Sequence, residues 1–560
     1  MSLPTSSAPP HAVWKPSKSM PIPTTDILTF AFANLGRYDN DQPIFIDATD
    51  PSRSISALRA LRVVRRLIKG LKELGLKEGD CVCLHAFNNI WYPLIWLGII
   101  GTGACVSGTN PAYNASELVR LFHLTKPKFI FVQGHCVHPI MQAASDCGVP
   151  QGNIFVVGLP EGPPLQGIRD WQTLLLDGEG DWHGSFDDAQ ADPGRIAVYS
   201  MTSGTTGLPK AAMVPHRSIV AQSALLECQF NARPYQPSQL ISLPVFHAFA
   251  SPLAMILPLR LGMPTYFLPR FVLQDFLHAV HNYHITDVPL VPPIVASLNQ
   301  LPVADHSLLE SLRYIICAGA QMTASVQTKL YDVLAPNAVV AQCWGTTEAG
   351  WHTLFGWNEN DTSGSVGRLL PNVELKLVDD NGIVVAHEGK LAEALVKSPV
   401  LFTGYLDNPD ETQAAFDSEG YYRTGDRVFV VDNKVFYEGR IKEVMKVNGW
   451  QVSPTELETV LLEHPMILDV AVVGITETDQ GGLPVTRPRA YIVRGPVRMA
   501  EDDEERKPLT VEAVQEFVAG RLISYKRLTG GVVFVKFIPR SATGKIMRHR
   551  LAETPLDLQG

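Results

Sequence analysis

One short segment, residues 199–210, reads Tyr-Ser-Met-Thr-Ser-Gly-Thr-Thr-Gly-Leu-Pro-Lys and directly follows an apolar run. Glycines let the backbone approach a ligand closely, successive exposed N–H groups bind anions, and the hydroxyls add donors. A polyphosphate is the ligand that suits this segment best. It is not a Walker A sequence, because Gly204 and Gly207 are three residues apart and Pro209 precedes Lys210. For the segment alone, a plain Gly/Thr-rich surface turn remains the alternative.

The composition describes a globular chain of more than one domain. Its 560 residues exceed one ordinary core, and 46% of them are apolar while 18% are charged. The net charge of −9 and the lack of a long Lys/Arg run give no support for nucleic-acid or membrane-surface binding. The eight cysteines form no paired Cys-x-x-Cys set, so neither a zinc site nor a disulfide framework is indicated.

Neither end of the sequence resembles a secretory signal or the common peroxisomal targeting tripeptide. The first twenty residues are rich in Pro and Ser and lack the apolar stretch of a secretory signal, and the last three are Leu-Gln-Gly rather than the peroxisomal Ser-Lys-Leu. The most apolar stretch, residues 90–106, is broken by a proline and glycines. This pattern predicts a buried helix leading into a strand rather than a membrane span. We expect a cytoplasmic protein.

Apolar runs typical of strands alternate with helical patterns through most of the chain. Strands are expected at 128–132, 153–157, 239–244 and 312–317, and a helix at 56–74. This alternation predicts an α/β fold of layered, largely parallel sheets, which bind ligands at the carboxyl ends of their strands. Residues 199–210 and 317–322 both follow such ends. Shorter alternating strands at 373–378, 394–396 and 428–431 predict a small β-barrel-like subdomain.

A different unit begins near residue 440. Ser453 as N-cap, Pro454 as first residue and Glu456 three residues after the cap predict a helix that starts with a capping box. Strands at 470–473, 490–493 and 532–537 and a helix at 511–521 complete a small α+β module.

Four more motifs follow in order: Gln-Cys-Trp-Gly-Thr-Thr-Glu-Ala-Gly at 342–350, Tyr-Tyr-Arg-Thr-Gly-Asp at 421–426, Gly-Arg-Ile-Lys-Glu-Val-Met-Lys-Val-Asn-Gly-Trp-Gln at 439–451, and Pro-Arg-Ser-Ala-Thr-Gly-Lys-Ile-Met-Arg at 539–548. With the 199–210 segment they resemble the adenylate-forming superfamily of acyl- and aryl-CoA ligases, amino-acid adenylation domains and beetle luciferases. The closest resemblance is to 4-coumarate–CoA ligase-like enzymes of a variety common in fungi, and it covers nearly the whole chain.

The resemblance implies a two-step reaction. A carboxylate attacks the α-phosphate of ATP to give acyl-AMP and pyrophosphate, and a thiol, usually coenzyme A, then displaces AMP to form the thioester. In this family a small C-terminal domain rotates between the two steps and exchanges the catalytic surfaces. We therefore expect an N-terminal adenylation domain at 1–439, a hinge at 440–442 and a mobile C-terminal domain at 443–560.

The resemblance also assigns the nucleotide contacts. A set of small, hydroxyl and basic residues is expected to bind the β- and γ-phosphates: Thr202, Ser203, Gly204, Thr205, Thr206, Gly207 and Lys210. The α-phosphate falls to Thr347 with neighbours Gly345 and Thr346, Mg²⁺ to Glu348, the ribose to Asp426 and Arg440, and adenine to Gln342, Ala318, Gly319 and Ala320. The alternatives are a helix cap followed by a first-turn acid for 347–348, a Gly-Asp turn for Asp426, and a tight strand end for 318–320.

Further roles are implied for the C-terminal motifs. Lys545 is the expected adenylation residue, because a lysine is a compact mobile charge that stabilises a pentavalent phosphate. Lys442 matches the hinge, and Lys446 and Gln451 match residues that reach the acyl-adenylate. The pantetheine arm of CoA is assigned to Asn448, Gly449 and Trp450. The alternative for each lysine is an ordinary solvated side chain.

The acyl site is assigned to His247, Phe249 and Trp344, with His247 near the carboxylate and catalytic. A core histidine is the alternative. Phe246-His247 stands where amino-acid-activating relatives tend to carry an aspartate, so amino-acid activation is disfavoured, because a buried ammonium would lack a partner. Trp344 and Trp351-His352 depart from the family pattern. Aromatic pocket candidates favour an aryl, arylalkanoic or medium-chain acid.

The sequence therefore predicts an acid–thiol ligase that uses ATP, Mg²⁺, coenzyme A and a small carboxylic acid. The main alternative is an enzyme that loads its acyl-AMP onto the phosphopantetheine arm of a carrier protein. A luciferase-like oxygenase and a nucleotide-binding protein without chemistry are further alternatives. The last is disfavoured because Lys545, Glu348 and Asp426 are all present.

Overall fold

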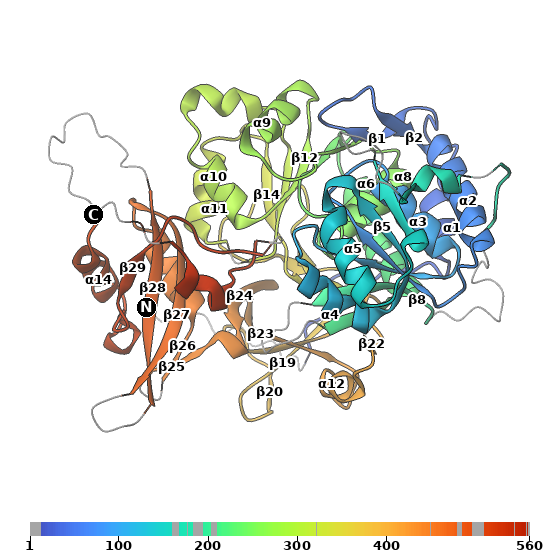
Figure 1. Ribbon diagram of the computed structural model, residues 1–560. Helices are drawn as coiled ribbons and strands as arrows, with labels where there is room; N and C mark the ends of the chain where they lie inside the picture. The colour runs from blue at the N-terminus through green and yellow to red at the C-terminus, as the bar shows by residue number, and fades with distance from the viewer. Residues whose placement is uncertain are drawn as a thin grey trace.

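The computed structural model describes residues 13–158, 167–175, 177–182, 194–202, 210–320, 322–447, 450–478, 484–495, 509–541, 544–555 and 557. Two large α/β sheets, a smaller antiparallel sheet and a C-terminal α+β unit make up the molecule (Figure 1). The predicted α/β class, with a large N-terminal domain and a small C-terminal one, is confirmed. Within the described part of the chain, no helix is both long and apolar enough to cross a membrane.

The first large sheet has eight strands in the order β22-β9-β8-β4-β3-β5-β6-β7. Their bounds are β3 Cys81–His85, β4 Cys105–Gly108, β5 Pro127–Gln133, β6 Ile154–Val157, β7 Arg169–Asp170, β8 Ile196–Thr202, β9 Lys210–Pro215 and β22 Gly404–Tyr405. The strands from β7 to β8 run parallel, whereas β9 and β22 are antiparallel to their neighbours. Every residue of β3 is buried, as expected of a central strand covered on both faces.

The second large sheet has seven strands in the order β14-β13-β12-β10-β11-β1-β2. Their bounds are β1 Pro43–Asp47, β2 Ser54–Ser56, β10 Gln239–Ile241, β11 Thr265–Phe267, β12 Asp287–Leu290, β13 Tyr314–Cys317 and β14 Val339–Gln342. All neighbours pair in parallel except β1 and β2. The carboxyl ends of β13 and β14 therefore meet at one edge, which carries residues 318–320 and the motif after Gln342.

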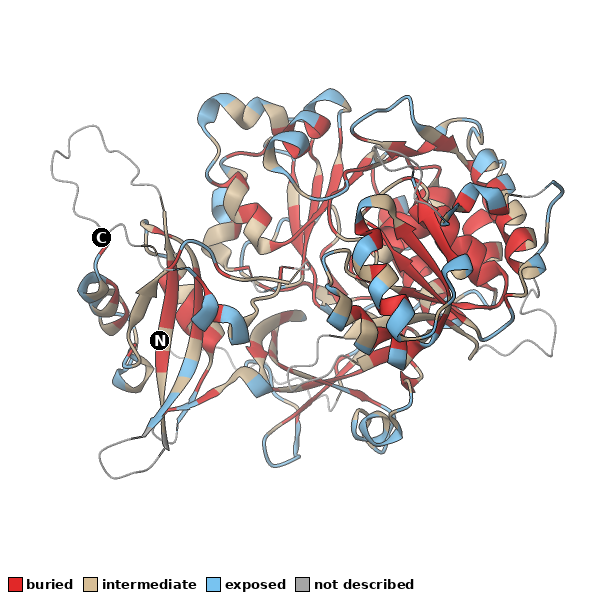
Figure 2. Ribbon diagram, viewed as in Figure 1, coloured by how far each residue is buried: buried red, intermediate tan, exposed pale blue. Residues whose placement is uncertain are grey.

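Helices cover both sheets, and Figure 2 shows the buried residues concentrated in the strands and the helices against them. The helices are α1 Ile27–Phe32, α2 Ala57–Glu73, α3 Tyr92–Gly101, α4 Ala115–Thr125, α5 Val137–Asp146, α6 His216–Asn231, α7 Ser251–Met255, α8 Leu257–Leu261, α9 Leu273–Asn282, α10 Pro292–Leu298, α11 Ala324–Tyr331 and α12 Pro409–Ala414. All ten residues of α3 are buried. The predicted buried helix leading into a strand is thus α3 followed by β4.

A five-stranded antiparallel sheet, ordered β20-β19-β21-β23-β24, forms the small β subdomain. Its strands are β19 Glu374–Val378, β20 Val384–Val385, β21 Ala392–Lys397, β23 Tyr422–Val431 and β24 Lys434–Arg440. The alternative of a Gly-Asp turn at Asp426 is excluded, because this residue lies inside β23. Gly425 has a φ of +68°, and the pairing of β21 with β23 shifts register across this point. A bulge with a glycine in the left-handed region therefore redirects the Asp426 side chain.

The C-terminal unit packs two helices, α13 Pro454–Leu462 and α14 Val511–Ala519, on β-structure. Its strands are β25 Met445–Val447, β26 Trp450–Val452, β27 Ile467–Thr478, β28 Pro484–Arg494 and β29 Val532–Phe534. The predicted capping box is wrong: the Ser453 hydroxyl donates to the Glu438 carbonyl at 3.0 Å, and Glu456 pairs with Lys526. Tertiary partners outcompete the local cap, so the cap residues join α13 to β24 and to the rest of the unit.

Candidate active site

The predicted phosphate segment joins two antiparallel strands. Thr202 is the last residue of β8 and lies opposite Lys210, the first residue of β9. The intervening predicted contacts, Ser203, Gly204, Thr205, Thr206 and Gly207, lie outside the described residues. The Lys210 ammonium donates to Glu411 Oε2 at 2.6 Å and lies 5.0 Å from the ring centroid of Tyr405. Half of the Glu411 side chain is exposed, so this ion pair is weak and leaves the lysine available to phosphate.

The motif at 342–350 forms a β-hairpin from β15 Gly345–Thr346 and β16 Gly350–Trp351. Thr347 and Glu348 occupy its turn, so the helix-cap alternative for these two residues is excluded. The Tyr405 hydroxyl donates to Glu348 Oε1 at 3.0 Å. The neighbouring Thr346 hydroxyl lies 3.3 Å from His352 Nε2. The hairpin thus holds a hydroxyl and a carboxylate side by side at the end of the second sheet, while Gly345 is exposed there.

Asp426 is buried at the centre of a polar cluster. Its Oδ2 accepts from the indole N–H of Trp344 at 2.8 Å, and its Oδ1 lies 3.3 Å from Arg440 Nε across the β23–β24 pair. Burial raises the pKa of Asp426, while Arg440, Trp344 and Lys545 oppose this change. The attraction of Asp426 raises the pKa of Arg440. Because Oδ1 makes no hydrogen bond to any described residue, a ligand hydroxyl can use it.

Lys545 comes from the C-terminal unit and reaches the same cluster. Burial and the Arg440 charge lower the pKa of Lys545, and the carboxylates of Asp426 and Glu348 oppose this change. The preceding Gly544 has a φ of +80°, and a Cβ added there would lie 3.2 Å from Val291 Cγ2, just before α10. The loop that carries the lysine is therefore seated on the large domain, and residues more than a hundred positions apart share one charge cluster.

The remaining nucleotide predictions lie at the neighbouring strand ends. Gln342 is buried at the end of β14, and its amide donates to Gln327 Oε1 at 3.0 Å. Gly319, with a φ of +90°, follows β13 between Ala318 and Ala320. These positions stay predictions for the adenine contact, since each is also consistent with a tight strand end.

An internal cavity of about 70 Å³ opens beside Thr347. It lies between the hairpin and the buried helix α3, and most of its wall is apolar. The lining residues are Tyr92, Trp96, Gly108, Val198, Ser200, Val214, Ser218, Ile219, Gln222, Val245, Phe246, Ala248, Ser251, Pro252, Ile256, Thr347, Gly350 and Val400. Its position next to the predicted α-phosphate contact makes it the candidate acyl pocket.

The predicted acyl residues lie around this cavity rather than in its wall. The wall contains Phe246 and Ala248 in place of His247 and Phe249. Trp344 instead packs in the core of the β subdomain and contacts Asp426. His247 Nδ1 accepts from the Phe249 N–H at 3.2 Å, so its proton resides on Nε2. Burial and the nearby Lys545 charge lower the pKa of His247 to about 3, which keeps a neutral N–H donor near the Lys545 ammonium.

The other C-terminal predictions are not brought to this site. Lys442 is exposed in the 3₁₀ turn Ile441–Glu443, and Lys446 is exposed in β25. Gln451 accepts from Arg427 at 2.5 Å and donates to Asp380 at 3.3 Å on the surface. Trp450 is 58% exposed and stacks on Tyr525, with ring centroids 5.0 Å apart. Asn448 and Gly449 lie outside the described residues. All six remain predictions for a different arrangement of the C-terminal unit.

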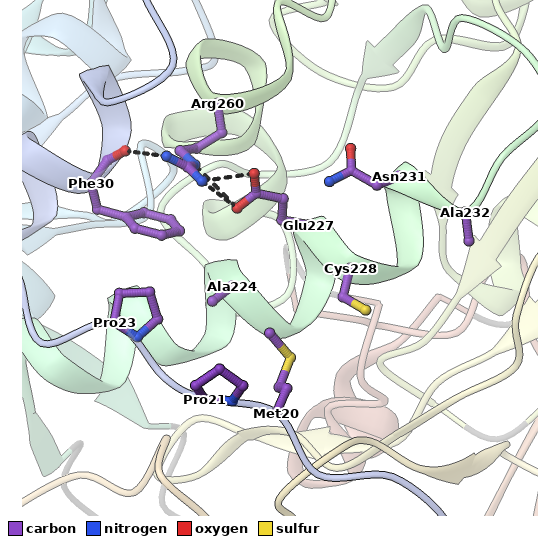
Figure 3. Close-up of a pocket in the computed structure, with 10 residues that line it drawn as sticks. All are labelled: Met20, Pro21, Pro23, Phe30, Ala224, Glu227, Cys228, Asn231, Ala232 and Arg260. Carbon is purple, nitrogen blue, oxygen red and sulfur yellow. Dashed lines mark hydrogen bonds and ion pairs between the residues drawn. The ribbon is translucent and has the colours of Figure 1, made fainter.

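A larger cavity of about 510 Å³ lies elsewhere on the large domain (Figure 3). It contains no predicted site residue. Its charged groups are paired: Arg260 donates to both carboxylate oxygens of Glu227 at 2.7–2.8 Å and to the Phe30 carbonyl at 3.1 Å. A cavity whose polar groups already satisfy one another offers little to a reacting acid, so size alone does not identify the active site.

Four histidines with lowered pKa values should make the folded state sensitive to acid. Burial lowers the pKa of His85 to about 4 and those of His216, His247 and His352 to about 3. Below pH 6.5 the unfolded chain binds protons at these positions while the folded chain does not, so stability must fall as the pH falls from 6.5 towards 4. Each group contributes up to about 1.4 kcal/mol per pH unit.

Denaturant unfolding between pH 7.5 and 4.5 checks this. His352→Gln should flatten the pH dependence below pH 6.5, whereas replacement of the exposed His138 by Gln should leave it unchanged. A pH dependence that is identical in both variants and the parent would contradict the assignment.

Comparison with known proteins identifies the family. The AMP-binding enzyme model matches residues 32–406, and the AMP-binding enzyme C-terminal domain model matches 456–545. The acyl-CoA ligase azaF of Aspergillus niger is 39% identical over 543 residues, covering 95% of this chain and 99% of that protein. The phenylacetyl-CoA ligase epaB of Aspergillus niger is 39% identical over 544 residues, covering 96% and 98%.

A solved structure, the anthranilate CoA ligase AuaEII in complex with anthranoyl-AMP, superposes with a TM-score of 0.82 at 22% identity, covering 95% of this chain and 98% of that one. At this identity the similarity concerns the fold. The family models and the full-length relatives confirm the prediction of an AMP-forming acid–thiol ligase. The chain belongs to the AMP-binding enzyme family, within the adenylate-forming superfamily that its motifs resemble.

Proposed function

We propose that this enzyme joins a small aryl or arylalkanoic acid to coenzyme A at the expense of ATP, through an acyl-adenylate. The observation that carries the proposal is the charge cluster of Lys545, Asp426, Arg440 and Glu348 beside the cavity at Thr347. In this proposal Lys545 serves as a mobile cation, Asp426 as a ribose acceptor and Glu348 as a metal-binding carboxylate. The phenylacetyl-CoA ligase named above supports an arylalkanoic acid, as does the wall of Trp96 and Phe246.

In the first step the acid carboxylate attacks the α-phosphorus, and the bond to the bridging oxygen of pyrophosphate breaks. Negative charge grows on the α-phosphate oxygens, where the Thr347 hydroxyl and the Lys545 ammonium stabilise it. Asp426 accepts the ribose hydroxyls through Oδ1, which makes no hydrogen bond to a described residue, and fixes the nucleotide. The neutral His247 donates its Nε2–H towards the carboxylate end of the acid.

Magnesium fits this site through one protein ligand. Glu348 is a carboxylate at the hairpin turn, and no group of three or more His, Cys, Asp or Glu that could hold a metal occurs in the described residues. Mg²⁺ typically takes one or two carboxylates and completes its shell with phosphate oxygens and water. Bound there, it would neutralise triphosphate charge.

In the second step the thiolate attacks the acyl carbon and releases AMP. Trp450 and Lys446 are exposed on the C-terminal unit, as groups that act in another arrangement would be. We propose the bounds 1–439 and 443–560 for the two domains and residues 440–442, with Lys442, for the hinge. Loading of a carrier protein finds no support among the relatives named above.

ATP–pyrophosphate exchange across a panel of carboxylic acids tests the proposal. Aryl and arylalkanoic acids should give Mg²⁺-dependent exchange, and added CoA should convert the adenylate to a thioester. Transfer to a phosphopantetheinylated carrier protein in preference to CoA would favour the alternative acceptor. No exchange with any acid in the panel would overturn the proposal.

A further inference from the structure

The wall of the candidate acyl pocket contains an amide whose donor has no partner. Gln222 lies in α6, is only 5% exposed and lines the cavity. Its Oε1 accepts from the Trp351 N–H at 2.7 Å. An N–H group can only donate, so this bond fixes which end of the amide faces Trp351. Nε2 must therefore face away from it, and among the described residues Nε2 finds no acceptor.

The hairpin holds this amide in place. Gly350 has a φ of +64°, and a Cβ there would lie 2.3 Å from Gln222 Oε1 and 2.5 Å from Val400 Cγ1. Only a glycine permits this approach of the hairpin to α6. The orientation of the amide is thus coupled to the turn that carries Thr347. The position of Nε2 is therefore fixed along with that of Oε1.

A second lining residue, Tyr92, also carries a polar group without a partner among the described residues. Tyr92 begins the buried helix α3, is 1% exposed, and its hydroxyl makes no hydrogen bond to any described residue. A Cβ at Gly108 would lie 2.9 Å from this hydroxyl, so the glycine leaves room for it. Phe246 Cβ would lie at the same distance from that Cβ. Two residues of the cavity wall, one from α6 and one from α3, therefore each carry a buried polar atom without a partner among the described residues.

An acid that fills the cavity must either satisfy these groups or seal them from water. A pure hydrocarbon ring would leave both unpaired, which is costly for buried donors. A site built to hydrogen-bond its substrate rejects analogues that lack the matching group far more strongly than an apolar pocket rejects a missing methylene.

We propose that Gln222 and Tyr92 select an aryl or arylalkanoic acid that carries a hydrogen-bond acceptor, such as a ring hydroxyl, methoxy, carbonyl or ring nitrogen. Gln222 Nε2 donates to this acceptor, and the Tyr92 hydroxyl pairs with a second polar substituent or with the same one. This assignment rests on the proposed function, because it takes the cavity to be the acyl pocket.

The test measures kcat/KM for pairs of acids that differ in one substituent: phenylacetic against hydroxy- and methoxyphenylacetic acid, and cinnamic against hydroxycinnamic acid. The parent enzyme should prefer the acceptor-bearing member of at least one pair by about tenfold or more. Gln222→Met should remove most of that preference, lowering kcat/KM for the substituted acid while the unsubstituted acid changes less than about threefold.

Two further variants keep the test informative if the methionine variant folds poorly. Gln222→Glu retains an acceptor for Trp351 but presents an oxygen to the pocket, so it should disfavour acceptors and favour ring donors such as an amino group. Tyr92→Phe removes only one oxygen. Gln229→Met, on the same helix but outside the cavity wall, is the matched control and should leave every ratio unchanged.

Equal losses for both members of each pair in Gln222→Met and in Tyr92→Phe would overturn the assignment and leave these residues a purely structural role. A parent enzyme that prefers the unsubstituted acids would also overturn it, while the proposed function would stand. If no acid supports pyrophosphate exchange, the proposed function fails, and this inference fails with it.

Discussion

Replacing Lys545 by alanine is expected to lower the rate of adenylate formation by at least about 100-fold. The lysine approaches the cluster of Asp426, Glu348 and Arg440, where burial and a second cation already lower its pKa. The electrostatic interaction of this ammonium is strongest when negative charge develops on a bound phosphate, because the triphosphate supplies the negative charge that the site lacks. ATP–pyrophosphate exchange measures this step. Lys545→Arg should recover only part of the rate, since a planar guanidinium replaces a compact ammonium.

The loss should be confined to the first half of the reaction. Thioester formation from a purified acyl-adenylate and CoA should stay within about threefold of the parent rate, because the proposed second arrangement moves Lys545 away from the acyl carbon. Lys536→Ala removes an exposed lysine of the same unit and is the control. An exchange rate in Lys545→Ala within tenfold of the parent would refute the assignment of this lysine.

Replacing Asp426 by alanine is expected to raise KM for ATP by about 10- to 100-fold and to lower the melting temperature. Its carboxylate is 2% exposed, accepts from the Trp344 indole and faces Arg440. Removing one member of a buried ion pair leaves the other charge uncompensated, and a buried donor unpaired. Arg440 is partly exposed, at 31% of its side chain, so solvent reduces the loss of stability below that of a fully buried pair.

Two other variants separate the ribose contact from structural support. Asp426→Asn keeps an acceptor for Trp344 but not the charge that faces Arg440, so it should lose less stability than Asp426→Ala while KM for ATP rises. Trp344→Phe removes only the indole N–H, and should lower stability by about 1–2 kcal/mol with a smaller change in KM. If Asp426→Asn leaves KM for ATP unchanged, Asp426 serves only to hold Trp344 and Arg440.

The sequence predicts most of the layers because periodicity and apolar runs are local signals. The buried helix α3 and strand β4 were both expected from residues 90–106, and α2 begins after Ser56 as its pattern predicts. The local prediction fails where distant segments compete. Ser453 bonds to Glu438 in place of its own helix, and Gly425 forms a bulge inside a strand rather than a turn.

The site residues likewise fall into those that the sequence predicts and those that it does not. Motif positions such as Lys545 and Asp426 are predicted from the resemblance, and the structure brings them into one cluster. The orientation of residues 243–250 is not predictable, because this segment is neither strand nor helix, and Phe246 and Ala248 face the cavity instead of their neighbours. Gln222 and Tyr92 carry no motif. A polar residue within an apolar helical face was the one signal that could have pointed to them.

The antiparallel pairing of β8 with β9 has a consequence for how the enzyme holds a triphosphate. Among the described residues, the connection ends at Lys210, which begins strand β9 rather than a helix. Side chains such as Lys210 therefore supply part of the charge that compensates the phosphates, and Lys545 arrives only with the C-terminal unit. If docking of the C-terminal unit increases the affinity for ATP, bound ATP must favour the docked state by the same free energy. Bound ATP therefore stabilises the docked C-terminal unit as well as reacting. When pyrophosphate leaves, part of this stabilisation is lost, and the docked state becomes less favourable.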